Sequence, residues 1–326
     1  MKGYQIAIVN SSSFGKWYLE HVERLQKIGK VSFFQFPEDI DGRTLAKKLF
    51  GYNIIISSVT PSFSKEFFDY KDETLLISRH GIGYNNIDIT AATEKKTKVA
   101  IVSPLVERDA VAENAISNLM MLVRKSVDSV ITTRNDGWNQ RASFLGNTLT
   151  GKTFGVVGCG NIGTRVAEIF KNGFNGNVIV NDPKENQEWA KKHSIKYVTL
   201  EELLFQADII SLNASLDGTS HHILNKKTFA KMKRGVYITN AARGALVCEE
   251  DLLEAIEVGI VKGLATDVMI EEPANHTHPY FNNKQILITP HTSAYTAECL
   301  KGMGNKCVLD VENMIQGKKI ECLVNP

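Results

Sequence analysis

A glycine-rich turn, GCGNIG at residues 158–163, restricts the fold of this chain more than any other segment. An apolar run of strand length (153–157) precedes the turn, and an amphipathic run of helical length follows it. In this context Gly158 makes the tight bend, Gly160 lets a pyrophosphate approach the backbone, and Gly163 lets the helix pack on the strand. The N-terminus of the helix then offers free N–H groups and the positive end of its dipole to the phosphates. The turn therefore predicts a dinucleotide-binding domain.

An acidic residue at the expected distance strengthens this prediction. Asp182 ends the apolar run NVIVND, 19 residues beyond Gly163. A carboxylate in this place accepts hydrogen bonds from the adenosine ribose, and its charge repels a 2′-phosphate, so NAD is favoured over NADP. Lys184, two residues later, would soften this preference. The competing interpretation is a structural glycine-rich turn followed by a solvated aspartate.

The rest of the chain alternates apolar runs of strand length with amphipathic runs of helical length. Continuous apolar runs are typical of parallel strands that helices cover on both faces, so the alternation predicts an α/β architecture. A single long helix is expected over about 109–134, followed by a loop up to about residue 152. In the N-terminal part we expect strands at residues 4–9, 31–36, 53–57 and 74–78. Beyond residue 152, six runs predict a doubly wound parallel sheet: TFGVVG, NVIVND, ADIISLN, GVYITNA, IVKGLATDV and QILITP.

The composition gives no sign of a nucleic-acid or membrane partner. The chain has 326 residues, enough for about two domains. Its 38 Lys and Arg balance 36 Asp and Glu, so the composition gives no basic surface for nucleic acid. The sequence contains no run of 18 apolar residues, which is the length that a membrane-spanning helix needs. The start of the chain is typical of a strand rather than a signal peptide, and the five cysteines form no C-x-x-C pair. We therefore expect a cytoplasmic protein without disulfides or a metal site.

Three polar segments each follow an expected strand, which is where ligands bind in open parallel sheets. Arg243, in NAARG, can bind a carboxylate through paired N–H donors. His291, in TPHTS, stands between a strand and an expected helix that Thr292 or Ser293 would cap. A helix N-terminus lowers the pKa of a histidine, whereas a carboxylate partner such as Glu272 raises it into the range useful for proton transfer. Taken singly, each residue also fits a structural role, as a surface ion-pair partner or a structural histidine.

With these segments in this order, the chain resembles the D-isomer-specific 2-hydroxyacid dehydrogenases from about residue 74 to residue 320. The matching stretches are RHGIGYNNID (79–88), AVAENAISNLMMLVRK (110–125), VVGCGNIG (156–163), ADIISLN (207–213), NAARGALV (240–247), ATDVMIEEP (265–273) and ITPHTSAYT (288–296).

The resemblance implies a reaction and the residues that carry it. A small 2-oxo acid is reduced by NADH to the (R)-2-hydroxy acid, with His291 as proton donor and Glu272 as the partner that keeps it protonated. Arg243 binds the substrate carboxylate and polarises the keto group. The backbone of Ile82 and Gly83, in the stretch that matches the substrate loop, binds the carboxylate as well.

The same match implies further positions in the binding sites. His80 lies beside the substrate loop, where it either contacts the substrate or forms a supporting hydrogen bond. Asp267 is expected near the nicotinamide amide. The positions implied to contact the cofactor are Gly158, Gly160, Asn161, Ile162, Gly163, Asp182, Asn213, Ala214, Ser215, Ala241, Ala242, Arg243, Asp267 and His291.

The resemblance also implies the domain arrangement. A flavodoxin-like substrate domain is discontinuous, formed by residues 1–103 and 293–326, and a Rossmann-type NAD-binding domain (104–292) is inserted into it. A cleft between two such domains closes on the substrate and excludes water. The long helix that begins near residue 110 implies a two-fold homodimer.

Some positions depart from the family pattern. Asn213-Ala214-Ser215 stands where most members have His and Pro, Asn85 replaces an Asp, and Val106 stands where lactate-type relatives have a Tyr. These departures leave the side chain of the acid open. They also leave two alternatives: an NAD(H)-sensing regulatory protein of the same fold, and, as a weaker one, oxidation of formate or phosphite. The complete set of Arg243, Glu272 and His291 favours the 2-oxo acid reductase.

Overall fold

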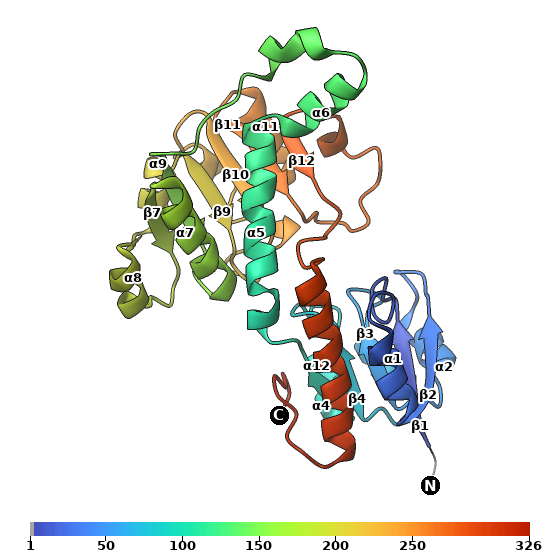
Figure 1. Ribbon diagram of the computed structural model, residues 1–326. Coiled ribbons are helices and arrows are strands. Elements are labelled where there is room, and N and C mark those ends of the chain that lie inside the picture. The colour runs from blue at the N-terminus through green and yellow to red at the C-terminus, as the bar shows by residue number, and fades with distance from the viewer. Residues whose placement is uncertain (1–2) are drawn as a thin grey trace. The chain divides into compact units, whose positions relative to one another are not determined.

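The chain forms two compact units in the computed structural model, which describes residues 3–326 (Figure 1). The first unit comprises the chain up to Glu107 together with Tyr295–Pro326, and the second comprises Arg108–Ala294. The boundaries expected from the sequence, after residue 103 and before residue 293, lie four and two residues away from these. Within residues 3–326, no helix combines the length and the hydrophobicity that crossing a membrane requires.

A five-stranded parallel sheet forms the centre of the first unit. Its strands are β1 (Tyr4–Val9), β2 (Gly29–Phe34), β3 (Ile54–Ser57), β4 (Leu76–Arg79) and β5 (Lys98–Ala100). Their order, β2-β1-β3-β4-β5, is the flavodoxin-like order. Apolar side chains fill both faces: along β1, Ala7 and Val9 belong to one core cluster, while Ile6 and Ile8 belong to the other. Burial on both faces explains why these strands are continuous apolar runs in the sequence.

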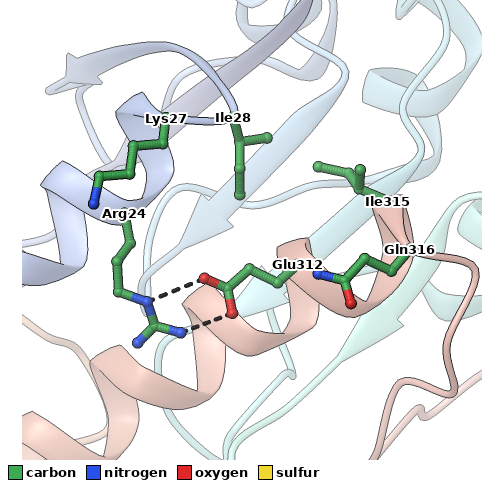
Figure 2. A pocket seen from close by; sticks show the side chains of 6 residues that line it. All are labelled: Arg24, Lys27, Ile28, Glu312, Ile315 and Gln316. Carbon is green, nitrogen blue, oxygen red and sulfur yellow. Dashed lines mark hydrogen bonds and ion pairs between the residues drawn. The ribbon is translucent and has the colours of Figure 1, made fainter.

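The last helix of the chain packs in the first unit. The helices here are α1 (Leu19–Gln26), α2 (Gly42–Lys48), α3 (Lys65–Tyr70), α4 (Ile89–Glu94) and α12 (Ala297–Ile315). Arg24 of α1 donates two hydrogen bonds, of 3.0 and 2.7 Å, to the carboxylate of Glu312 in α12, beside a hollow that Ile28 and Ile315 help to line (Figure 2). A partly exposed ion pair contributes only about 0–1 kcal/mol. The buried apolar face of α12, including Val308, therefore provides most of the attachment.

A seven-stranded parallel sheet forms the second unit. Its strands are β6 (Thr153–Val157), β7 (Asn177–Asn181), β8 (Lys196–Tyr197), β9 (Ile209–Leu212), β10 (Val236–Asn240), β11 (Val261–Thr266) and β12 (Ile286–Ile288). The order β12-β11-β10-β9-β6-β7-β8 is that of a doubly wound Rossmann sheet with one additional strand, so the predicted fold class is confirmed. The six expected strands are all present. The seventh, β8, has two residues, which is too short to leave an apolar run in the sequence.

Helices cover both faces of this second sheet. Core residues divide accordingly, with Val156 of β6 in one cluster and its neighbour Val157 in the other. The α-helices are α5 (Pro104–Val123), α6 (Ser126–Arg134), α7 (Asn161–Phe174), α8 (Gln187–His193), α9 (Leu200–Gln206), α10 (Lys226–Phe229) and α11 (Glu249–Glu257). The first four residues of α5 belong to the first unit. The short 3-10 helices are η1 (Trp138–Phe144), η2 (Gly244–Leu246) and η3 (Pro279–Asn282).

The single long helix expected over residues 109–134 is wrong, because the chain breaks it into α5 and α6. Lys125, between them, adopts a left-handed conformation with φ of 51°. The N–H of Lys125 bonds to the carbonyl of Leu122, three residues back, which ends the regular helical pattern. The segment after α6, expected as a loop, contains the 3-10 helix η1.

The helix expected directly after His291 is also absent from its predicted place. Thr292 and Ser293 cap no helix, since their N–H groups bond to the carboxylate of Asp267, at 2.9 and 2.8 Å. The next helix, α12, begins four residues later, and the side chain of Thr296 caps it by accepting from the N–H of Cys299. A helix dipole therefore does not act on His291 in the way the sequence suggested.

Candidate active site

The glycine-rich turn lies at the point where the strand order of the second sheet reverses, between β6 and β9. A Cβ atom on Gly158 would lie 2.4 Å from the backbone nitrogen of Ala214, and one on Gly163 would lie 2.0 Å from the carbonyl oxygen of Gly158. Both positions therefore require glycine, as predicted. A Cβ atom on Gly160 would meet nothing within 4 Å, so open space lies in front of this residue.

The residues around this space fit a dinucleotide. Gly160 is the N-cap of α7, and no side chain caps the helix, so the N–H groups of its first turn, at Asn161, Ile162 and Gly163, are available to a phosphate. Asp182 follows β7, and its carboxylate accepts the N–H of Cys159 and the N–H of Lys184, both at 2.7 Å. These bonds fix the carboxylate beside the glycine-rich turn.

The other expected cofactor positions follow neighbouring strands of the same sheet. Asn213, Ala214 and Ser215 come after β9, where the N–H of Asn213 bonds to the carbonyl of Val157 at 2.7 Å. The side chain of Asn213 donates to Ser211 within its own strand end. Ala241 and Ala242 come after β10. Parallel strands bring these segments to one edge of the sheet, although their contacts with the cofactor stay predictions.

Arg243 follows β10 in a turn that Asn240 shapes. The side chain of Asn240 accepts the N–H of Ala242 at 3.0 Å and donates to the carbonyl of Arg243 at 2.9 Å. A Cβ atom on Gly244 would lie 2.1 Å from the carbonyl carbon of Met269, so the arginine turn packs directly on the segment that leads to Glu272. Sequence reasoning placed Arg243 here but did not recognise Asn240, which stands three residues before it in the same motif.

His291 and Glu272 form a short hydrogen bond of 2.5 Å between Nδ1 and Oε2. The other carboxylate oxygen of Glu272 accepts the N–H of Met269 at 2.8 Å, so the acid is held from both sides. The hydrogen bond from Glu272, and then its charge and that of Asp267, raise the pKa of His291, against burial and the positive charge of Arg243, which lower it. Burial alone would raise the pKa of Glu272, but the bond to His291 and its charge outweigh burial and lower it. The pair therefore favours an imidazolium beside a carboxylate.

Asp267 holds the turn that carries His291. Its side chain is only 2% exposed, and it accepts the hydroxyl of Thr289 at 2.5 Å in addition to the N–H groups of Thr292 and Ser293. His291 itself has a positive φ of 52°, with its N–H shared between the carbonyls of Asp267 and Thr289. The structure thus shows Asp267 engaged with this turn, and its contact with a nicotinamide amide stays a prediction.

The predicted substrate loop belongs to the first unit, at the end of β4. Its conformation depends on Gly81, whose φ of 147° lies in the region that favours glycine, and the carbonyl of His80 accepts a bond of 2.5 Å from Arg79 Nη1. In the described part of the chain, the N–H groups of Ile82 and Gly83 make no hydrogen bond to protein. They are therefore available to an anion.

His80 is buried in the same loop, in surroundings that disfavour its protonated form. It is 8% exposed, packs edge-on against Phe14, and its Nε2 has no hydrogen-bond partner. Burial, and then the neighbouring charges of Arg79 and His21, lower the pKa of His80 to about 3. The ring is neutral near pH 7, which fits a supporting position or a neutral hydrogen bond to substrate. Among residues 3–326, no group of three or more His, Cys, Asp or Glu is arranged to hold a metal ion.

Comparison with known proteins shows the family to which the chain belongs. The family model described as "D-isomer specific 2-hydroxyacid dehydrogenase, NAD binding domain" matches residues 116–293. The chain belongs to this family. It is 31% identical over 304 residues to a protein of Staphylococcus aureus (strain N315) that is provisionally named a 2-hydroxyacid dehydrogenase, covering 92% of this chain and 95% of the relative.

Solved structures of this family have the same fold over almost the whole chain. A glyoxylate reductase from Paecilomyes thermophila is 29% identical with a TM-score of 0.83, covering 98% of each chain. The apo form of D-lactate dehydrogenase from Escherichia coli is 28% identical with a TM-score of 0.86, covering 98% of this chain and 99% of the other. This D-2-hydroxyacid dehydrogenase is an oxidoreductase that acts on the CH–OH group, and its cofactor is NAD.

The Glu272–His291 pair predicts how the pH profile of this dehydrogenase responds to Glu272→Gln. With His291 as the expected proton donor, the rate of reduction should fall as pH rises through the raised pKa of His291. The amide removes the charge and the carboxylate acceptor that raise this pKa, so the alkaline limb of kcat should move to lower pH. The measurement is kcat for reduction against pH. A profile equal to that of the parent enzyme would show that the two residues are not coupled.

Asp182 predicts the cofactor preference. Replacing it by Ser removes a negative charge that would face a 2′-phosphate, so kcat/KM for NADPH relative to NADH should rise about tenfold or more, equivalent to ~1.4 kcal/mol. Glu185→Gln is the matched control, because Glu185 lies in the same loop but bonds to Gln187 and not to the glycine-rich turn. Equal preference for both cofactors in the parent enzyme would remove Asp182 from the ribose site.

Proposed function

We propose that this dehydrogenase reduces a small 2-oxo acid to the (R)-2-hydroxy acid, with His291 as the proton donor. NADH, when bound, supplies a hydride to the keto carbon. The observation that carries the proposal is the 2.5 Å bond between His291 and Glu272, with Arg243 close enough to act electrostatically on both. No other histidine of the predicted site has a carboxylate partner and a raised pKa.

The hydrogen bond to Glu272 supports an assignment of roles to the two ring nitrogens of His291. Because Nδ1 bonds to Glu272, Nε2 carries the proton that is transferred to the keto oxygen. Glu272 remains ionised and stabilises the imidazolium before transfer. The side chain of His291 is 41% exposed, so solvent can return a proton to it in each cycle.

Arg243 supplies the charge that complements the substrate. One of its N–H groups, on Nη1, donates to the carbonyl of Ala242 at 2.7 Å, which orients the guanidinium and leaves further donors for a carboxylate. A donor near the keto oxygen would also stabilise the charge that develops there. The proposal also gives the N–H groups of Ile82 and Gly83, which make no hydrogen bond to protein within residues 3–326, a role in binding the substrate.

The proposal is tested by Arg243→Lys and His291→Ala, measured side by side with a panel of 2-oxo acids and the loss of NADH absorbance. An ammonium lacks the planar fork of a guanidinium, so Arg243→Lys should raise KM for the oxo acid and lower kcat, with kcat/KM down by ~10²-fold or more. His291→Ala should lower kcat by ~10²–10⁴-fold. The dissociation constant of NADH, from fluorescence, should change little in either variant, because the glycine-rich turn and Asp182 are expected to provide most of the affinity for NADH. Weaker NADH binding with unchanged oxo-acid kinetics in Arg243→Lys would place the arginine in the cofactor site.

We also propose that two copies of the chain form a homodimer through the segment 126–145, which we call the arm. Figure 1 shows the arm, in green, projecting beyond the sheet of the second unit. Neither α6 nor η1 contains a buried residue, although both expose apolar side chains such as Ile131 and Trp138, the latter 74% exposed. The arm has two Asp and two Arg, so two copies can meet without net repulsion.

Trp138→Glu and Ile131→Glu should convert the dimer into a monomer, because a charge would be buried at the interface. The folding of each unit should not change, since no buried side chain is altered. Light scattering after size exclusion measures the mass, with Gln140→Glu in the same arm as the control. A parent enzyme that is monomeric at micromolar concentration would contradict the proposal.

A further inference from the structure

Two asparagines of α5 form part of a closed ring of hydrogen bonds behind His291. Asn118 Nδ2 donates to Asn114 Oδ1 at 2.8 Å and to Thr289 Oγ1 at 2.9 Å. The ring continues from Thr289 Oγ1 to Asp267 Oδ1, from the N–H of Ser293 to Asp267 Oδ2, and from Ser293 Oγ to Asn114 Oδ1 at 2.9 Å. From this ring we infer that Asn118 and Asn114 are positioning residues, which set the place and the proton affinity of His291. The inference rests on the proposed role of His291.

The direction of every bond in the ring follows from chemistry. Asp267 is a carboxylate that can only accept, so the single hydroxyl hydrogen of Thr289 points to it. The oxygen of Thr289 must then accept from Asn118, which uses both of its amide hydrogens within the ring. Ser293 gives its hydroxyl hydrogen to Asn114 and its N–H to Asp267. Each donor hydrogen has one acceptor, so the ring has a single arrangement.

Because Asn118 is buried, its amide needs the hydrogen bonds of the ring. Asn118 is 3% exposed on a helix whose neighbours Leu119 and Ala115 are apolar core residues. A buried amide without hydrogen-bond partners is destabilising, so the hydrogen bonds of the ring are what allow an asparagine at this position. An apolar residue would satisfy the packing of α5 without any hydrogen bond. The hydrogen bonds that Asn118 makes toward the turn from Thr289 to Ser293 therefore explain why this position is an asparagine.

The ring acts on His291 because it fixes the turn on both sides of this residue. Thr289 lies two residues before His291 and Ser293 two residues after it, and each is bound both to Asp267 and to α5. Between them His291 keeps a left-handed backbone conformation, φ 52°, which is unfavourable for a histidine and needs support from its surroundings. The carboxylate of Asp267 also acts electrostatically on the imidazole. The bonds from α5 therefore support the turn directly and this carboxylate through Thr289 and Ser293.

Asn118→Leu tests the inference. It keeps the volume and removes both donors, so kcat for reduction should fall about tenfold, while KM for the oxo acid and the dissociation constant of NADH stay within about twofold of the parent. The alkaline limb of kcat and the titration of the His291 imidazole, followed by NMR and identified with His291→Ala, should both move to lower pH. Asn114→Leu, at a partly exposed position, should have the same effects if Asn118→Leu does not fold.

Two variants separate positioning from stability. Thr239→Val removes another buried bond to α5, from Thr239 Oγ1 to the carbonyl of Ala115 at 3.0 Å, which lies outside the ring. This variant should lower the free energy of unfolding without shifting the alkaline limb of kcat or the NMR titration of His291. Asn114→Asp keeps an acceptor for both donors and adds a negative charge, so kcat should be retained and the alkaline limb should move to higher pH, opposite to Asn114→Leu.

The outcomes separate this inference from the proposed function. If Asn118→Leu and Asn114→Leu keep the pH profile of the parent and lose no more kcat than Thr239→Val, the ring is structural and the inference is overturned. If His291→Ala keeps the kcat of the parent, the proposed function fails as well. If the pH profile of Asn118→Leu and Asn114→Leu moves to lower pH and His291→Ala loses turnover, the results support both the inference and the proposed function.

Discussion

The charge of a single buried carboxylate, Asp267, decides the shape of the site. A carboxylate that is 2% exposed needs donors on its oxygens, because an unpaired buried charge costs several kcal/mol. The chain meets this need with the hydroxyl of Thr289 and the N–H groups of Thr292 and Ser293, so the turn between β12 and the first unit folds around the acid. His291 lies in the middle of that turn. Its position is therefore a consequence of how Asp267 is satisfied.

Parallel strands bring Arg243 and Glu272 to the same edge of the sheet as His291. In the register of the sheet, Asn240 pairs with Thr266 and Thr266 pairs with Ile288, so β10, β11 and β12 end level with one another. The segments that follow them contain Arg243, Glu272 and His291 in that order. The sheet thus brings Arg243 and His291 to the same edge, although they are about fifty positions apart in the sequence. The close packing of Gly244 on Met269 then fixes the distance between the first two segments.

The sequence predicted the features that depend on local pattern. Strands buried on both faces are apolar runs, and a glycine that must approach another backbone is recognisable beside a strand. The turn at 158–163 and every strand of both sheets except the short β5 and β8 were therefore predictable. Two features that depend on distant partners were not predicted. Thr292 and Ser293 have the residue types of a helix cap, yet their N–H groups bond to a carboxylate 25 and 26 residues away. Asn118 interrupts an apolar helix, and this signal was visible, but its partner Thr289 lies 171 residues further along the chain.

The environments of two histidines show why residue type alone could not determine the acid. His80 and His291 both lie in segments that match the family, and in the sequence either could titrate near neutral pH. Burial without a carboxylate partner lowers the pKa of His80 to about 3, because the charged ring would lose its hydration and gain nothing in exchange. His291 is also partly buried, but Glu272 and Asp267 compensate the loss of hydration and raise its pKa. The same side chain therefore has a lowered pKa in one unit and a raised pKa in the other, and the difference is the placement of two carboxylates.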